Sequence, residues 1–383
     1  MTVDGTDASA SPEANSMSMA GGFNNTIKIL SLEAIQEVNV TKGIAPAEIA
    51  NTLSGNINLI SKSGTNNFHG SLFENYQTGG LNARNQFLTR KPQSVFHQFG
   101  GSAGGPVIKN KLFFFGVYEG LRQSSFQALS AQVPTQEYRA RALAAQPGYK
   151  QFFDVLNLPN QPYPTGRCTA TDLVGCVATF NGAGSSTARD NHIVARGDYY
   201  LTSTNLVSVR YTQAEPSQET PNANSPVNSR AFDTTSSAMT ASLTHSRTRF
   251  STESRFGYRT SDLGRIDALF NLGVPGLNVQ NPTFGMAGEV TFSRGTSYNF
   301  EQVASLSKGR HSIKFGGLFQ IHDQTRENEE LPEIRFCNDA DFIANISCNL
   351  QVTWGLSPYL LKQWGLGFFI QDDFKVNSRL VLN

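Results

Sequence analysis

The sequence predicts an all-β transmembrane fold, an antiparallel β-barrel preceded by part of a small α/β domain. Three observations predict it. Apolar and polar residues alternate along many segments of about nine to thirteen residues, the length of a tilted strand that crosses a bilayer. Short and long connections alternate between these segments. No run approaches the roughly 18 apolar residues that a membrane-spanning helix needs, so a closed barrel is the remaining way to cross.

The composition suits a protein made of many strands and turns. Glycine (34 residues) and phenylalanine (27 residues) are abundant, whereas hydrophobic residues make up only 39% of the 383 residues. The net charge of +1 gives no reason to expect a nucleic-acid partner, because proteins that bind phosphate backbones usually carry a basic excess.

Residues 1–66 are predicted to form the α/β segment. Residues 32–40 alternate apolar with polar, and 57–60 offer a second short strand. The chain begins with a polar run rich in Ser, Ala and Met, which has neither the basic nor the apolar region of a signal peptide. We therefore expect a fragment that starts inside a longer protein.

Residues 67–383 are predicted to form the N-terminal part of the barrel. In 206–212, Val207, Val209 and Tyr211 share one face while polar residues share the other, as lipid-facing and lumen-facing sides require. Charged residues keep to one face in the later segments as well. We count ten strands and the start of an eleventh, at which the sequence stops before the barrel closes.

The connections predict which end of each strand faces the outside, because outer-membrane barrels have short periplasmic turns and long extracellular loops. Short turns are expected near 109–111, 202–205, 247–248, 308–310 and 376–378. Long loops are expected at about 78–95, 122–190, 214–236, 261–297 and 323–361.

Four cysteines fall as two local pairs in loop-like segments: Cys168 with Cys176, and Cys337 with Cys348. This pattern favours two loop disulfides, which persist in the periplasm and at the cell surface. Four unrelated free thiols are the alternative. A metal site is not expected, because neither pair has the two-residue spacing of zinc knuckles.

Other motifs do not predict an enzyme. Residues 100–104 satisfy G-x-S-x-G, but Pro106 and a β-rich run follow where a hydrolase needs a helix. The six histidines are dispersed and show no metal-ligand spacing. The tripeptide at 196–198, associated with integrin adhesion, lies within a predicted strand, where Arg196 and Asp198 share a face. We predict no catalytic residue, cofactor or metal.

Several stretches resemble the TonB-dependent outer-membrane receptors of the Oar-like type common in Acidobacteria. They are residues 31–38, 54–74, 81–85, 98–115 and 369–376. The second is similar to the family's junction between plug and barrel, and it contains Lys62, Ser63, Gly64, Thr65, Asn66, Phe68, His69 and Gly70. Residues 62–67 also have the composition of a polar turn between two strands.

The resemblance implies that 1–66 are the C-terminal part of a plug domain and that 67–383 hold about 10 strands of an expected 22. It implies a location in the bacterial outer membrane, in contact with its lipid. It also implies two partners: an extracellular ligand of unknown class, and the TonB energy-transducing complex, which would act through an N-terminal region that this chain lacks.

The function implied is uptake of a large or scarce ligand, such as an oligosaccharide, a peptide or a siderophore-like compound, without enzymatic activity. A passive channel or a surface adhesin without energised transport is the alternative, and a secreted β-sandwich is a third hypothesis. Four loop aromatics suit either stacking on sugar rings or packing of the loop itself. They are Tyr149, Phe152, Phe153 and Tyr163.

Overall fold

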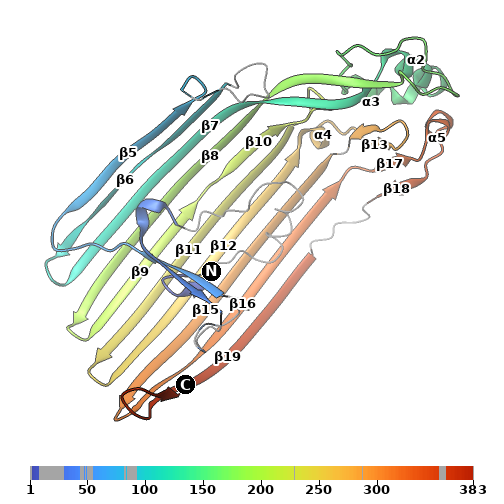
Figure 1. The fold of residues 1–383 in the computed structure, drawn as a ribbon. Coiled ribbons are helices and arrows are strands. Elements are labelled where there is room, and N and C mark those ends of the chain that lie inside the picture. The colour runs from blue at the N-terminus through green and yellow to red at the C-terminus, as the bar shows by residue number, and fades with distance from the viewer. Residues whose placement is uncertain are drawn as a thin grey trace.

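The computed structural model describes residues 2–7, 30–43, 47, 49, 55–81, 83, 93–227, 229–286, 288–352 and 359–382. Most of them form one large antiparallel sheet, which we call the wall (Figure 1). Its strands are β5 (His69–Thr78), β6 (Ser94–Ile108), β7 (Leu112–Pro134), β8 (Val177–Thr202), β9 (Asn205–Ala214), β10 (Ser217–Pro221), β11 (Ser229–Arg247), β12 (Phe250–Asp267), β15 (Glu289–Lys308), β16 (His311–Glu330), β19 (Tyr359–Lys375) and β20 (Val381–Leu382).

Neighbouring strands of the wall pair antiparallel and follow each other along the chain, with β9 and β10 sharing one place. Because β9 and β10 both lie between β8 and β11, they form one interrupted strand. The described residues therefore contain ten wall strands and the start of an eleventh, which confirms the predicted count. Within these residues β5 and β20 lie at the two edges of the sheet. The expected total of 22 strands stays a prediction.

The two faces of the wall differ in chemistry as predicted. A row of exposed apolar residues crosses four neighbouring strands through Phe256, Phe300, Phe319 and Leu366, each opposite the next. One residue earlier on β12, Arg255 lies on the other face and pairs with Glu301. The first face suits lipid and the second suits a polar lumen.

Most wall strands are longer than the predicted nine to thirteen residues, although β5 and β9 have 10 residues each. β7 has 23 residues and β8 has 26, and their upper parts pair with each other through 122–134 and 177–190, which we expected to be loop. This prediction was wrong because both faces meet water beyond the bilayer. Backbone pairing continues there, whereas the apolar alternation that reveals a strand disappears.

The short turns were predicted correctly. Successive strands are separated by residues 109–111, 203–204, 248–249, 309–310 and 376–380. Asn110 (φ 62°) and Gly309 (φ 61°) adopt the left-handed conformation that such tight turns need.

A second, smaller sheet lies against the lumen face of the wall (Figure 1). This small sheet consists of β1 (Thr2–Val3), β2 (Thr6–Asp7), β3 (Ile35–Lys42) and β4 (Gly55–Ser61), in the order β2-β1-β4-β3. A 3₁₀ helix, η1 (Leu32–Ala34), precedes β3. Strands β3 and β4 match the predicted ones, whereas β1 and β2 were not predicted. An apolar cluster joins small sheet to wall through Val3, Ala34, Leu59, Phe115 and Val194, among others.

Three long connections, 135–176, 268–288 and 331–352, come together at the end of the wall opposite the short turns (Figure 1). We call this assembly the loop module. Its helices are α2 (Gln136–Ala145), η2 (Pro147–Tyr149), α3 (Lys150–Asp154), α4 (Ala268–Asn271) and α5 (Asp339–Ala344). Its sheet, in the order β14-β13-β17-β18, consists of Phe284–Met286, Gly276–Val279, Glu333–Phe336 and Asn349–Gln351. None of the helices in the described ranges is long and apolar enough to cross a membrane.

Candidate functional site at the interface of small sheet and wall

The predicted junction residues run from the end of β4 into the first two residues of β5, beside the turn at 109–111. They are Lys62, Ser63, Gly64, Thr65, Asn66, Phe68, His69 and Gly70. Asn66 Nδ2 donates to Asn110 Oδ1 (2.6 Å), and the Asn110 backbone N–H donates to Asn66 Oδ1 (2.8 Å). This reciprocal pair of hydrogen bonds joins the junction to the first short turn of the wall.

Glycine at position 64 lets the junction lie directly on the β6–β7 hairpin. A Cβ there would overlap the carbonyl oxygen of Phe114. Gly105 gives similar room to the ring of Phe68, which also contacts Phe114 with ring centroids 6.4 Å apart. The junction is thus a close-packed contact as well as a polar turn. The stretch 81–85 also carries the family resemblance, and its residues 82, 84 and 85 lie outside the described residues.

The β1–β2 hairpin lies at one edge of the small sheet and contacts the wall directly. Its two central residues, Asp4 (φ 47°) and Gly5 (φ 80°), both have the positive φ of a type I′ turn. The Asp4 carboxylate accepts hydrogen bonds from the backbone N–H (2.8 Å) and hydroxyl (2.7 Å) of Ser61 on β4. An Asp-Gly pair is a strong hairpin signal, so the sequence contained a sign of this element that we did not use.

Hairpin and wall are joined by buried charged and hydroxyl groups. Asp4 Oδ2 lies 2.7 Å from Arg210 Nη1, and Asp4 Oδ1 lies 3.7 Å from Arg196 Nη1. Arg210 Nη2 donates to Thr240 Oγ1 (2.9 Å), and that oxygen lies 3.0 Å from Thr6 Oγ1 on the hairpin. Side chains on β8, β9 and β11 therefore hold one hairpin from three adjacent strands.

The tripeptide at 196–198 belongs to this network. Arg196 and Asp198 share the lumen face of β8, as predicted, and form an ion pair of 2.9 Å. Ser208 on β9 donates to Asp198 (2.6 Å), and Arg196 also donates to the carbonyl oxygen of Ser61 (2.8 Å). Both charged side chains form ion pairs or hydrogen bonds inside the lumen, so they are not displayed for cell adhesion.

A second polar contact holds η1 against the wall. Ser31, which caps η1, donates from its hydroxyl to Glu119 on β7 (2.5 Å). Gln98 on β6 donates to the other carboxylate oxygen of Glu119 (2.8 Å). Glu33 of η1 accepts a hydrogen bond from Ser71 on β5 (3.0 Å). Three wall strands, β8, β11 and β12, and the interrupted strand formed by β9 and β10 separate this contact from β15.

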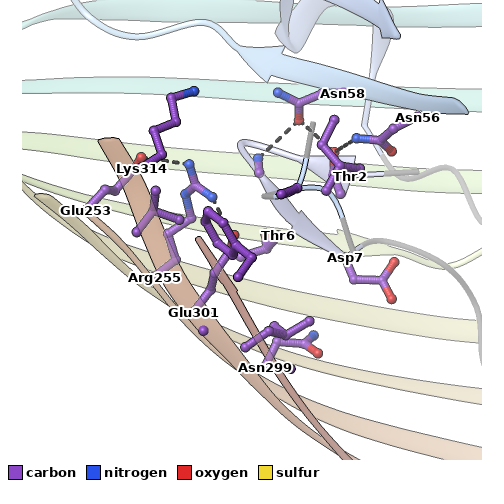
Figure 2. Close-up of a pocket in the computed structure, with 18 of the residues that line it drawn as sticks. Thr2, Thr6, Asp7, Asn56, Asn58, Glu253, Arg255, Asn299, Glu301 and Lys314 are labelled. Carbon is purple, nitrogen blue, oxygen red and sulfur yellow. Dashed lines mark hydrogen bonds and ion pairs between the residues drawn. The ribbon is translucent and has the colours of Figure 1, made fainter. Parts of the chain in front are cut away.

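A cavity of about 570 Å³ lies between the small sheet and strands β12, β15, β16 and β19 (Figure 2). From the small sheet, the hydroxyl of Thr2 and the backbone N–H of Gly5 both donate to Asn58 Oδ1. On the wall side, Arg255 bridges Glu253 (2.7 Å) and Glu301 (3.1 Å). The lining combines these charged and amide side chains with apolar ones such as Leu318, Phe368 and Phe369, so it can hold water and polar solutes beside an apolar patch.

No group of three or more potential metal ligands occurs among the described residues. Ser102, the serine of the G-x-S-x-G match, lies within β6, and its hydroxyl is 2.8 Å from that of Ser71 on β5. This is the strand setting that the sequence predicted for it.

The loop module has its own core, which sequence reasoning missed. Disulfides join Cys168 to Cys176 and Cys337 to Cys348. Arg141 on α2 forms two hydrogen bonds with the Asp339 carboxylate on α5 (2.6 and 2.9 Å), linking loops that are 198 residues apart. The rings of Tyr149 and Phe342 stack with centroids 4.3 Å apart. The loop aromatics were compatible with packing inside a loop, but the residues that they contact lie in other, distant loops.

This core decides between the two roles that the sequence left open for the loop aromatics, and for three of them the role is packing of the loop. Tyr149, Phe152 and Phe153 are 9%, 5% and 2% exposed and pack inside the module. The Tyr149 hydroxyl donates to the Phe342 carbonyl oxygen (2.8 Å), and burial raises the pKa of Tyr149 to about 12. Tyr163 is half-buried. The first three rings therefore stabilise the loop and are closed to a ligand.

The chain matches known proteins over most of its length. Residues 60–383 match the family model described as "Outer membrane beta barrel domain". The TonB-dependent transporter Oar of Myxococcus xanthus is 35% identical over 94 residues, which are 22% of this chain and 9% of that protein. The outer membrane transporter YddB from Escherichia coli has the same fold, with a TM-score of 0.53 and 9% identity over 90% of this chain.

The chain spans only part of these relatives, since the match covers 41% of the Escherichia coli transporter. The family match includes the whole of the wall, whose lipid-facing and lumen-facing sides agree with it. The chain therefore belongs to the outer membrane β-barrel domain family, is located in the bacterial outer membrane, and is a relative of the TonB-dependent transporter Oar.

Proposed function

We propose that the chain is part of a TonB-dependent receptor that takes up a large or scarce ligand across the outer membrane. In this proposal residues 1–66 are the C-terminal part of the plug, and residues 67–383 are the N-terminal part of the barrel. The observation that carries the proposal is the small sheet docked on the lumen face of the wall through hydrogen-bonded polar and charged side chains.

The composition of this interface supports a plug that can be displaced. Its contacts are mostly polar, such as Asp4 with Arg210 and Ser31 with Glu119, and water can replace each of them when the sheets part. A hydrogen bond to a charged group contributes about 1.5–3 kcal/mol, so each of these contacts stabilises docking by only a few kcal/mol. The apolar cluster around Val3 and Leu59 is small. A mechanical pull can therefore separate the sheets without unfolding an extended core.

The proposed energy source is the TonB complex, which would pull on the region preceding the small sheet. The proposed ligand is an oligosaccharide, a peptide or a siderophore-like compound, captured from outside near the loop module. The cavity lined by Arg255, Glu301 and Asn58 would enlarge into a passage as the small sheet moves.

The test is uptake by cells that express the complete gene product, in strains with and without TonB. The probes are a labelled oligosaccharide, a labelled peptide and a ferric siderophore. We expect uptake of one probe in the TonB-containing strain and its loss in the TonB-deficient strain. Uptake that continues at the same rate without TonB would exclude energised transport.

A surface adhesin is the second candidate, because the loop module forms a disulfide-bonded domain at the outer end of the wall. Cells that express the complete gene product would then bind other cells equally well with or without TonB. Deleting residues 135–176, the part of the loop module between β7 and β8, would abolish that binding.

A further inference from the structure

Two arginines face each other across neighbouring strands of the wall. Arg196 on β8 is directly opposite Arg210 on β9, and their side chains are only 16% and 6% exposed. Like charges placed directly opposite each other destabilise a sheet, and buried guanidinium groups need negative partners. This pair therefore requires anions nearby.

The wall supplies one negative charge and the hairpin supplies another. Asp198 on β8 pairs with Arg196, and Asp4 on the hairpin pairs with Arg210. With the hairpin docked, two guanidinium groups and two carboxylates give this cluster a net charge of zero. Without the hairpin, two positive charges and one negative charge leave a net charge of +1. The hairpin thus contributes the anion that the wall lacks.

The wall has donors to spare beside the Arg210 side chain, where the hairpin contributes Val3, Thr6 and Asp7. Arg210 Nε and Thr212 Oγ1 are buried and have no hydrogen-bond partner among the residues that the structure describes. Both side chains line a cavity of about 30 Å³ under the hairpin, together with Thr240 and Arg259. A larger anion than one carboxylate would therefore find additional donors at this place, and guanidinium groups bind carboxylate and phosphate in two-pronged geometry.

We propose that Arg196, Arg210 and Thr240 form an anion-binding site on the lumen wall, and that Asp4 occupies it as a built-in ligand while the small sheet is docked. A carboxylate or phosphate group of the transported ligand takes the place of Asp4 when the hairpin withdraws. The replacement of Asp4 by a ligand group rests on the proposed transport function, whereas the anion-binding site itself does not. The ligand class is accordingly anionic.

Chemical rescue tests the site itself. Asp4→Gly removes the carboxylate and keeps a Gly-Gly turn, which still permits the hairpin. We expect the Tm of the purified, complete gene product in detergent to fall by about 3 °C, as read from its heat-dependent gel mobility. Sodium formate should restore the Tm, sodium chloride at equal ionic strength should not, and inorganic phosphate shows whether the larger anion also fits.

Matched variants decide the outcome. Asp4→Asn fills the same space without charge and should respond less to formate than Asp4→Gly. Adding Arg210→Met to Asp4→Gly should abolish the response. The site is refuted if formate leaves Asp4→Gly unchanged, or if it acts equally on the double variant. If Asp4→Gly folds only poorly, the yield of folded protein with and without formate becomes the measurement, and equal yields refute the site.

The ligand class is tested separately, by uptake in TonB-containing cells of two labelled oligosaccharides of equal length, one bearing carboxylates and one uncharged. We expect Arg210→Gln to slow uptake of the carboxylated probe about tenfold relative to the neutral one. An unchanged ratio overturns the anionic ligand class. Because formate rescue requires neither TonB nor uptake, failure of the transport proposal would leave the rescue result intact.

Discussion

Oδ2 of Asp4 lies 2.7 Å from Nη1 of Arg210, a residue 206 positions further along the chain. This ion pair joins the tip of a two-residue turn to β9 of the wall. Both side chains are mostly buried, at 21% and 6% exposure. The docking of the small sheet therefore depends on a few precisely placed contacts, which substitutions can test individually.

Gly5→Ala should weaken docking of the hairpin. Gly5 has φ +80°, and a Cβ there would lie 2.6 Å from Cζ of Arg255, which already bridges two glutamates. We expect a loss of about 2 kcal/mol from backbone strain and displaced contacts. The measurement is the rate at which a protease cuts the small sheet in the folded protein.

Gly43→Ala is the control for that substitution. Gly43 has φ +84° but no atom within 4 Å of its added Cβ, so it carries the backbone strain without the clash. Gly5→Ala should accelerate cleavage more than Gly43→Ala does. Equal rates would mean that contact with Arg255 contributes nothing.

Gly64→Ala should disturb the junction, because its Cβ would overlap the carbonyl oxygen of Phe114. The junction would have to move away from β7, which costs about 1–3 kcal/mol. We expect a lower yield of folded protein in refolding from urea. Gly116→Ala, on the neighbouring part of β7, meets its nearest atom at 3.8 Å and should refold like the unaltered protein. A normal yield for Gly64→Ala would contradict the close packing of the junction.

Asp339→Asn should loosen the loop module. The carboxylate is 7% exposed and binds Arg141 through both oxygens, so its loss leaves a partly buried guanidinium without its counter-charge. We expect a loss of about 2–3 kcal/mol, seen as faster tryptic cleavage within 135–176.

The exposed pair of Lys150 and Asp154 provides the comparison. Its side chains are 70% and 57% exposed, and exposed pairs contribute little to stability. Asp154→Asn should therefore leave the cleavage rate within about twofold. If the two variants behave alike, the Arg141–Asp339 pair does not hold the module together.

The loop module should lose stability at high pH. Burial raises the pKa of Tyr149 to about 12 from its ordinary value of about 10. The folded module favours the neutral phenol, so this stabilisation is complete below pH 10 and is lost as the pH rises from 10 to 12. Burial likewise raises the pKa of Tyr138, with the Asp339 carboxylate adding to the effect.

Absorbance of tyrosinate near 295 nm, recorded during alkaline titration, measures this loss. In Tyr149→Phe the titration should lack one late-ionising phenol, and the alkaline unfolding midpoint should depend less on pH. An unaltered titration curve in Tyr149→Phe would show that this phenol ionises at an ordinary pH.

The sequence predicted the wall wherever each strand separates lipid from lumen. In 206–212, alternation identified the faces of β9 correctly, and the short turns followed from polar residues between such segments. The same signal fails above the bilayer, where both sides of β7 and β8 meet water. This is why residues 122–134 and 177–190 were assigned to a loop.

The site could be predicted only in part. The junction at 62–70 was found because its residues are consecutive. The ion pair of Asp4 with Arg210 joins two residues that are 206 positions apart, and the sequence around either one does not indicate the other as its partner. The core of the loop module likewise depends on Tyr149 meeting Phe342, which lies in a different loop. Periodicity reports which face a residue occupies and does not identify its distant partner.

The length of β7 and β8 determines how far the loop module stands from the cell. At a rise of about 3.3 Å per residue, the 26 residues of β8 extend roughly 86 Å, and a tilt of about 45° converts this to a height of roughly 60 Å. The apolar band of an outer-membrane barrel is only about 25 Å tall. The loop module is therefore held well beyond the apolar band, by strands whose upper parts meet water on both faces.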